Sequence, residues 1–413
     1  MKHKTLPAAA PHVWLARLGT AQQRVSMLAG DGKGWGKLLA WNPTAQFVYR
    51  RGHGRLPELS EFVEAQTAAG RKVLGYLAYD LGYELLDIPQ TTTNDLNLPD
   101  AYFLAYDNYL ELTAKATIVH YRDEAFLHEA EALSQTEPQL AAGAILTQAF
   151  KAILSKKEYD QAYAKVKQYI LDGDTYQVNL THRLEAQTRA APRQIFARLS
   201  ERTTAGFMAY LEGPDFTVHS VSPERFVQIN GKRIETYPIK GTRPRGPGSR
   251  QELLDSPKDA AELNMITDLL RNDLGRVSQG GSVKVLAARE ILQTPTLFHT
   301  FSHIVGTLRD DVRPIEAVLS MFPGGSITGC PKKRAMEIID ELEPYNRSVY
   351  CGSVLAIEPD GSLDSSIPIR TLIQKGNRLV LQVGGGIVHH SQGNAEYQET
   401  WDKAKAIITA LAD

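Results

Sequence analysis

One lysine stands between a short apolar run and a Gly-Thr turn in the segment YPIKGTRPRG, residues 237–246. The amine of a lysine beside apolar residues could act as a nucleophile once it is desolvated. A solvated lysine at the end of a strand has the same local sequence, and most lysines are solvated. The segment alone therefore favours a solvated lysine, and Lys240 gains interest only from the other segments.

Two acidic residues share one face of a helix predicted over residues 256–275. Ser256 and Pro257 are typical of a helix start. Asp259 and Glu262 are three residues apart, so their carboxylates point the same way. Paired carboxylates suit a hard cation such as Mg²⁺. Acidic residues also stabilise a helix N-terminus without any ligand, and in isolation that interpretation is favoured.

The last predicted helix carries a second acidic pair. Glu396, Glu399 and Lys403 recur at positions i, i+3 and i+7, away from an apolar face that includes Tyr397 and Leu411. The helix therefore presents two carboxylates and an ammonium group on one side. A solvated face with a salt bridge has the same pattern and is preferred when this helix is taken alone.

Two glycine-rich stretches could bring the backbone close to a ligand. In FPGGSITGCPKKRAMEIIDELEP, residues 322–344, a loop runs into a helix beside Lys332, Lys333 and Arg334, which is typical of an anion site. The spacing is not that of the phosphate loop G-x-x-x-x-G-K-[ST], so we expect a carboxylate there. The glycines at 384–386 follow a buried strand and either admit a ligand or form a turn.

Composition narrows the class of protein. The 413 residues include 46 basic and 47 acidic side chains, a net charge of −1, and 43% are hydrophobic. These values exclude a disordered chain and argue against nucleic-acid binding through bulk charge. No apolar run is long enough to cross a membrane. With two cysteines, Cys330 and Cys351, we expect the reducing cytoplasm rather than a secreted, disulfide-linked protein.

The elements that must position these residues divide into two regions. Residues 1–150 are strand-rich, and residues 151–413 begin with a helix whose start, Ser155 followed by Glu158, fits a capping box. The run TYQVNLTHRL then alternates, which predicts a strand with one buried face. We expect the second region to contain the catalytic residues.

Taken together, the segments resemble the chorismate-utilising enzymes, which include anthranilate synthases, aminodeoxychorismate synthases, isochorismate synthases and salicylate synthases. The resemblance rests on SPERF, PIKGTRPRG, AELNMITDLLRNDLGRV, FPGGSITGCPKKRAMEIIDELEP, IPIRT, GGGIV and AEYQETWDKA. It covers residues 155–411 closely and residues 1–150 more loosely. It implies an α+β fold with two large antiparallel sheets packed face to face, outer helices, and an active site in the central cleft.

Lys240 distinguishes the members of the family. PIKGT resembles the aminodeoxychorismate synthases, in which this lysine attacks C2 of chorismate before ammonia enters at C4, whereas anthranilate synthases have Ala in PIAGT. Gln177 stands where isochorismate and salicylate synthases carry a water-activating lysine, which argues against those activities. The resemblance thus implies 4-amino-4-deoxychorismate synthesis for 4-aminobenzoate and folate. The alternatives are anthranilate synthase component I, a non-catalytic chorismate-binding homologue and, more distantly, a phosphate-binding enzyme.

The resemblance also implies roles for individual residues. Glu224 corresponds to the acid that protonates the departing 4-hydroxyl, and His299 to an active-site histidine whose role is open. Glu262 and Glu399 correspond to direct Mg²⁺ ligands, with Asp259 and Glu396 acting through water. Substrate contacts are expected from Ser326, Tyr350, Arg370, Gly384, Gly385, Gly386 and Lys403.

The sequence contains no G-x-C-x-G nucleophile elbow of a glutaminase. Nitrogen is therefore expected as free ammonia or from a partner, a glutamine amidotransferase subunit. The expected ligands are chorismate, ammonia and Mg²⁺, with no nucleic acid and no membrane.

Overall fold

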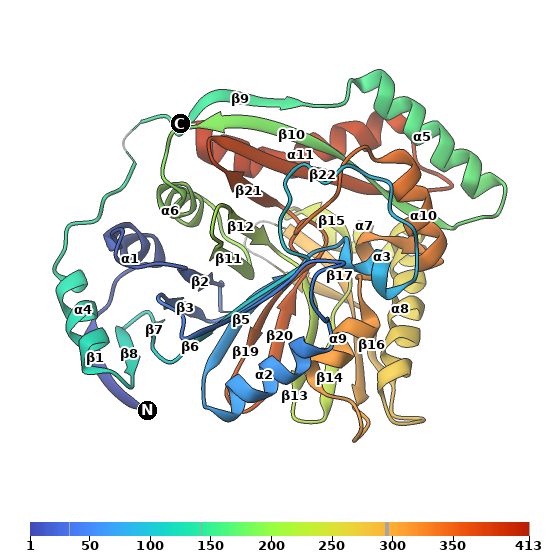
Figure 1. Ribbon diagram of the computed structural model, residues 1–413. Helices are drawn as coiled ribbons and strands as arrows, with labels where there is room; N and C mark the ends of the chain where they lie inside the picture. The colour runs from blue at the N-terminus through green and yellow to red at the C-terminus, as the bar shows by residue number, and fades with distance from the viewer. Residues whose placement is uncertain (33, 142, 294–296, 413) are drawn as a thin grey trace.

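The computed structural model describes residues 1–32, 34–141, 143–293 and 297–412. Two large antiparallel sheets face each other, with helices on their outer sides (Figure 1). Apolar side chains from both sheets fill the space between them, among them Leu28 and Val218 from one sheet and Leu74 and Val354 from the other. The predicted α+β class with two facing antiparallel sheets is confirmed.

The first sheet combines strands from both predicted regions. Its order is β1 (Lys2–Pro7), β8 (Ala116–Tyr121), β7 (Tyr109–Leu112), β3 (Lys37–Ala40), β2 (Ser26–Ala29), β11 (Phe207–Glu212), β12 (Thr217–Ser222), β21 (Thr371–Lys375), β22 (Arg378–Val388), β10 (Gln177–Thr188) and β18 (Gly329–Cys330), with β9 (Leu146–Ala152) also on β10. The regions meet where β2 pairs with β11, Leu28 opposite Ala209.

The second sheet is built in the same way. Its order is β15 (Ile239–Pro244), β17 (Leu297–Thr307), β14 (Arg233–Thr236), β13 (Arg225–Asn230), β20 (Leu363–Ser366), β19 (Ser353–Ile357), β5 (Lys72–Leu77), β6 (Ala101–Tyr106) and β4 (Ala45–Tyr49), with β16 (Lys284–Gln293) also on β17. Here β5 pairs with β19, so residues 1–150 contribute strands to both sheets. The division of the chain at residue 150 stays a prediction about function.

The helices cover the outer faces of the sheets (Figure 1). They are α1 (Pro11–Arg17), α2 (Glu58–Ala68), α3 (Leu81–Leu85), α4 (Glu124–Ser134), α5 (Lys156–Leu171), α6 (Pro192–Arg202), α7 (Ser249–Asp255), α8 (Pro257–Val277), α9 (Pro314–Met321), α10 (Lys332–Leu342) and α11 (Gly393–Ala412), with a short 3₁₀ turn η1 (Gly325–Ile327). α8 packs on β15 and β17, and α11 packs on β22. Within the described ranges, no helix is both long and apolar enough to traverse a bilayer.

Local signals in the sequence explain the two helices predicted near the site. Ser256 accepts a hydrogen bond from the Asp259 amide at 3.2 Å at the start of α8. Ser155 and Glu158 form the predicted capping box of α5. Both predictions of a helix start are confirmed.

Strand β10 corrects the expectation of a single buried face. Gln177, Asn179, Thr181 and Arg183, predicted to face outward, are all buried. The polar face is covered by distant segments, since the Thr181 amide donates to Glu343 at 2.9 Å and Arg183 forms an ion pair with an aspartate of the first region. The turn alternative for residues 384–386 is also wrong, because these glycines lie inside β22.

Two buried histidines make the free energy of unfolding depend on pH in the acidic range. Burial lowers the pKa of His182 to about 4 and that of His219 to about 3, so both are neutral in the fold. His182 bonds the Thr400 hydroxyl of α11 at 2.8 Å. The unfolded chain binds a proton on each histidine below its ordinary pKa of ~6.5, so stability falls as pH drops below that value.

We predict that the free energy of unfolding falls between pH 6.5 and pH 4 by up to about 1.4 kcal/mol per pH unit for each histidine. Urea unfolding at pH 7, 6 and 5 measures this slope. His182→Gln and His219→Gln should each flatten it, whereas His128→Gln, at an exposed position on α4, should not. An equal slope in all four proteins would contradict the assignment.

Candidate active site

An acid, a hydroxyl and an amine from three separate segments of the chain meet at one place. Glu224 lies between β12 and β13, Ser326 in η1 and Lys240 in β15. The Ser326 hydroxyl donates to Glu224 Oε1 at 2.8 Å, and Lys240 Nζ donates to the Ser326 carbonyl at 3.4 Å. Burial raises the pKa of the Glu224 carboxyl, opposed by the nearby charges of Lys240, Lys403 and Arg370. A carboxyl with a raised pKa can keep its proton and act as an acid.

Arg370 follows the loop after β20 and has a left-handed backbone, with φ of 51°. Burial lowers the pKa of its guanidinium group, and the charge of Glu224 raises it. The cations of Arg370, Lys240 and Lys403 thus surround one acid. Lys403 is also paired with Glu399, and Lys240 also acts on Glu262, so Arg370 is the cation best suited to a carboxylate of a ligand.

Strand β22 and helix α11 form one wall of this site. Lys403 Nζ donates to the Gly384 carbonyl at 3.0 Å and pairs with Glu399 at 2.8 Å. A Cβ atom on Gly385 would lie 3.5 Å from a Glu396 carboxylate oxygen and 3.6 Å from Lys403 Nζ. The bare backbone of β22 therefore lies directly against the charged face of α11.

Helix α8 contributes the other acidic pair. Asp259 pairs with Arg243 at 3.0 Å, and Glu262 lies 3.9 Å from the amine of Lys258. Burial raises the pKa of Glu262, Lys240 lowers it, and the carboxylates of Asp259 and Glu396 raise it further. The α8 pair and Glu396 of α11 are thus close enough to influence one another, as expected for a shared site.

The acidic residues fit Mg²⁺ only as an open site. Across the ranges that the structure describes, no three His, Cys, Asp or Glu side chains form a ready-made metal cluster. Mg²⁺ commonly uses one or two carboxylates and completes its shell with water and substrate oxygens. Glu262 of α8 with Glu399 of α11 would meet that requirement; Glu399 is 55% exposed and paired with Lys403. The four predicted ligands stay a prediction.

His299 lies on β17 opposite Thr242 of β15, and its Nδ1 is 2.9 Å from the Thr242 hydroxyl. Burial, helped by the charge of Arg370, lowers the pKa of the imidazole. A neutral histidine near Arg370 and Lys240 can accept or donate a hydrogen bond without adding to the positive charge.

Tyr350 is buried, with 4% of its surface exposed. Burial raises its pKa, as does the adjacent Cys351. Burial also raises the pKa of the Cys351 thiol to about 12, with a contribution from the charge of Glu224. The Cys351 amide donates to the Pro368 carbonyl at 3.3 Å, and the Ile367 amide donates to the Glu224 carbonyl at 3.0 Å, so one short segment contacts both the turn and the residue that carries the acid.

The basic residues of α10 do not form the predicted anion site. Lys332 is buried against Asp273 at 2.9 Å and the Met321 carbonyl at 2.7 Å. Arg334 pairs with Asp174 at 3.2 Å. Only the loop part of the motif, through Ser326, reaches the site, because the basic side chains bind protein groups instead.

The sequence did not single out the ion pair behind the site. Arg347, 1% exposed, donates to the carboxylate of Glu343 and to the carbonyls of Asn179 and Ile327. Its guanidinium also lies 4.5 Å from the centre of the Tyr79 ring. The only signal was a Glu and an Arg four residues apart, which is also common on solvated helices.

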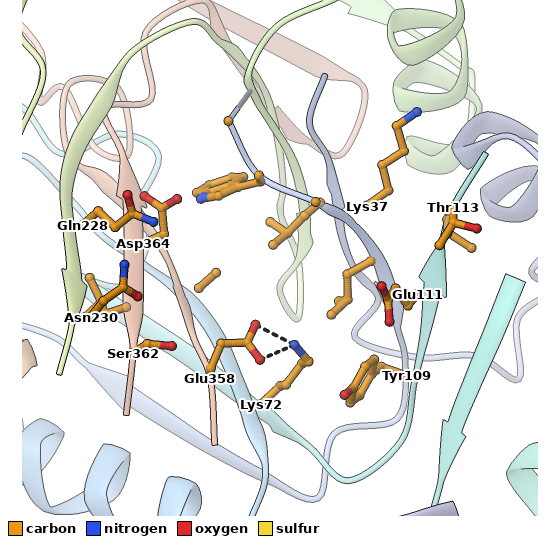
Figure 2. Close-up of a pocket in the computed structure, with 18 residues that line it drawn as sticks. Lys37, Lys72, Tyr109, Glu111, Thr113, Gln228, Asn230, Glu358, Ser362 and Asp364 are labelled. Atoms are coloured by element: carbon orange, nitrogen blue, oxygen red, sulfur yellow. Dashed lines mark hydrogen bonds and ion pairs between the residues drawn. The ribbon is translucent and has the colours of Figure 1, made fainter. Parts of the chain in front are cut away.

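A cavity of about 540 Å³ opens between the sheets in a separate place (Figure 2). Lys72 pairs with Glu358 in its wall, and Lys72 Nζ lies 4.7 Å from the centre of the Tyr109 ring. The described residues that line it include none of the predicted site residues. They are Leu28, Gly34, Trp35, Gly36, Lys37, Leu38, Lys72, Tyr109, Glu111, Leu112, Thr113, Gln228, Asn230, Ala356, Glu358, Ser362, Leu363 and Asp364.

Comparison with known proteins agrees with this arrangement. Residues 24–409 match the chorismate binding enzyme family. The chain is 41% identical to aminodeoxychorismate synthase component 1 of Klebsiella aerogenes over 82% of its length and 76% of the relative's. It is 35% identical to an anthranilate synthase component 1 of Haloarcula marismortui, over 92% and 86%.

Among solved structures, anthranilate synthase component I from Streptococcus pneumoniae superposes with a TM-score of 0.79 at 26% identity. The match covers 95% of this chain and 93% of that one. The fold, the family match over most of the chain and the relatives together lead to one conclusion: this chain belongs to the chorismate binding enzyme family.

Proposed function

We propose that this chain is the chorismate-aminating subunit of an aminodeoxychorismate synthase, making 4-amino-4-deoxychorismate for 4-aminobenzoate and folate. One observation carries the proposal: Ser326 contacts both reactive groups. The Lys240 amine donates a hydrogen bond to the Ser326 carbonyl, and the Ser326 hydroxyl donates one to the acid Glu224. A nucleophile and an acid joined through one serine can act on the two ends of the same allylic system.

Chorismate has two carboxylates, and the proposed site offers two sets of groups for them. Arg370 and the Tyr350 hydroxyl are assigned to the enolpyruvyl carboxylate, and the backbone around Gly385 with Lys403 to the ring side. Mg²⁺ held by Glu262 and Glu399, with Asp259 and Glu396 through water, would neutralise the ring carboxylate and stabilise charge as the hydroxyl leaves.

In the proposed first step, the neutral Lys240 amine forms a bond to C2 of chorismate. Both ring double bonds of the conjugated diene shift by one position toward C4, and the C4–O bond breaks. Glu224 gives its proton to the departing hydroxyl, which leaves as water. The raised pKa of Glu224 supports this role, since the group keeps its proton until the oxygen needs it.

In the proposed second step, ammonia bonds to C4 and both ring double bonds return to their original positions. The C2–N bond to Lys240 breaks, and the amine is released for another cycle. Two displacements at opposite ends of the conjugated system from C2 to C4 place nitrogen where the hydroxyl stood. His299, which is neutral and near Arg370, could accept a proton from the nitrogen of ammonia or of Lys240.

Anthranilate synthase is the second candidate, because relatives with that name are 34–37% identical to this chain. Their chemistry places ammonia at C2. In the proposed site, Lys240 occupies the approach to C2, so an amine is already present where ammonia would have to attack. Identifying the product by chromatography separates the two candidates.

The relatives named component 1 support a two-subunit enzyme, with a glutamine amidotransferase supplying ammonia. We propose that the enzyme acts in the cytoplasm. Its two cysteines, Cys330 and Cys351, are both free thiols, which supports this location.

The first prediction concerns the nucleophile. Lys240→Ala should lower formation of the 4-amino product by about 100-fold or more, because the covalent route is lost. Residual product should shift toward the 2-amino compound or anthranilate. Incubation with chorismate, Mg²⁺ and ammonium, followed by mass spectrometry, measures both. Wild-type enzyme with chorismate and no ammonia should show an adduct on the Lys240 peptide.

Lys232→Ala, at an exposed position between β13 and β14, is the matched control and should behave as wild type. An unchanged rate and product in Lys240→Ala would remove both the covalent mechanism and the preference over anthranilate synthase.

The second prediction concerns the cation. Glu262→Gln and Glu399→Gln should each lower kcat/KM by about 100-fold or more and weaken Mg²⁺ binding in calorimetry, because a carboxylate charge is lost. Asp268→Asn, on the exposed side of α8, should retain both. Full turnover in excess chelator would overturn the requirement for Mg²⁺.

The third prediction concerns nitrogen. The purified chain should use ammonium but not glutamine, and adding a separate amidotransferase subunit should confer glutamine-dependent activity. The reason is the missing glutaminase motif. Glutamine hydrolysis by the purified chain alone would contradict the two-subunit assignment.

A further inference from the structure

The turn that presents Tyr350 has an unfavourable backbone. Ser348 and Cys351 both have left-handed conformations, with φ of 53° and 63°, although neither is glycine. Such residues persist only where surrounding contacts hold them. Within the turn, the Tyr350 amide donates to the Arg347 carbonyl at 3.1 Å and the Gly352 amide to the Val349 carbonyl at 3.0 Å. These two bonds involve neither the backbone amide nor the backbone carbonyl of Ser348.

Both backbone groups of Ser348 are held by the N-terminal region. The Ser348 amide donates to Asp80 Oδ2 at 2.6 Å, and the Tyr79 amide donates to the Ser348 carbonyl at 2.7 Å. Asp80 is 4% exposed, and its other oxygen accepts from Gln90 Nε2 at 3.0 Å. Burial raises the pKa of the Asp80 carboxyl to about 7, and the bond from the Ser348 amide opposes this shift by favouring the carboxylate. In that form, a buried carboxylate that accepts an amide proton gives a strong and directional bond.

The loop after α3 extends this contact along the chain leading to the turn. The Thr93 amide donates to the Pro344 carbonyl at 3.0 Å, and the Asn346 amide donates to the Thr93 carbonyl at 3.0 Å. Gln90, which bonds Asp80, begins this loop. The N-terminal region thus fixes the segment from Pro344 to Ser348, and Asp80 lies at the end nearest Tyr350.

We infer that Asp80 is a positioning residue for substrate binding, which holds the left-handed turn at Ser348 and so keeps Tyr350 in place for the enolpyruvyl end of chorismate. The inference rests on the proposed role of Tyr350. Asp80 itself is separated from the substrate by the backbone of the turn. Its effect is therefore expected on the KM for chorismate and not on the chemical steps at Lys240 and Glu224.

The test measures chorismate consumption in the full-length enzyme with ammonium and Mg²⁺. Asp80→Ala should raise the KM for chorismate about tenfold with kcat within about threefold of wild type. Asp80→Asn, which keeps one acceptor oxygen, should raise KM about threefold. Asp123→Asn is the control, because Asp123 also accepts a backbone amide, that of Ala125 at 2.9 Å, at the distant start of α4. Its KM should stay at the wild-type value.

Two double variants distinguish positioning from a general loss of structure. Ser348→Gly should restore most of the KM in the Asp80→Ala background, since glycine adopts a positive φ without strain. Asp80→Ala should add nothing to the KM effect of Tyr350→Phe if Asp80 acts through Tyr350. Loss of kcat at unchanged KM, no recovery with Ser348→Gly, or multiplying effects with Tyr350→Phe would each overturn the inference.

If thermal unfolding shows that Asp80→Ala is not folded, the same comparisons in Asp80→Asn decide, and an unchanged KM there overturns the inference. Following chorismate rather than product keeps the two proposals apart. A 2-amino product would refute the proposed function while the KM comparisons still stand. Correct product with no KM effect in the Asp80 variants would refute only the positioning role.

Discussion

The buried ion pair of Arg347 and Glu343 connects the parts of the molecule that form the site. Arg347 donates to carbonyls of η1 and β10, at Ile327 and Asn179, from the segment that ends in the Tyr350 turn. Loss of one partner from such a pair leaves a buried charge without compensation, at a cost of about 3–5 kcal/mol. Because Ile327 follows Ser326, the same pair fixes the serine that lies between the acid and the amine.

Burial and the neighbouring charges have opposite effects on the pKa of Glu224. Burial alone favours a protonated Glu224, and the three cations around it favour the carboxylate. A bound dianion would cancel part of the cationic charge. The proton would then become more firmly held on Glu224 at the moment when a hydroxyl must be protonated. In the proposed reaction, substrate binding and acid catalysis would thus be linked through charge.

The sequence predicted the fold class and the elements whose signals are local. The starts of α5 and α8 depend on serine caps, which the sequence shows directly. The strand that contains the glycines of β22 is likewise visible as a short run of residues. The second buried face of β10 could not be predicted, because its cover comes from residues more than 80 positions away, such as Asp95 on Arg183. Asp80 and Arg347 could not be predicted for the same reason, since each also binds backbone groups of a distant segment, which no local pattern in the sequence reveals.

The interleaving of the two regions in both sheets affects how the chain is made. Strand β5 emerges early during synthesis, but its neighbour β19 follows about 280 residues later. At typical rates of 5–20 residues per second, the edge of β5 stays open for roughly 15–55 s. Open strand edges are templates for association with other chains. The nascent protein therefore exposes a strand edge that chaperones can bind during this interval. Any fragment of the chain that ends before β19 leaves the edge of β5 permanently unpaired.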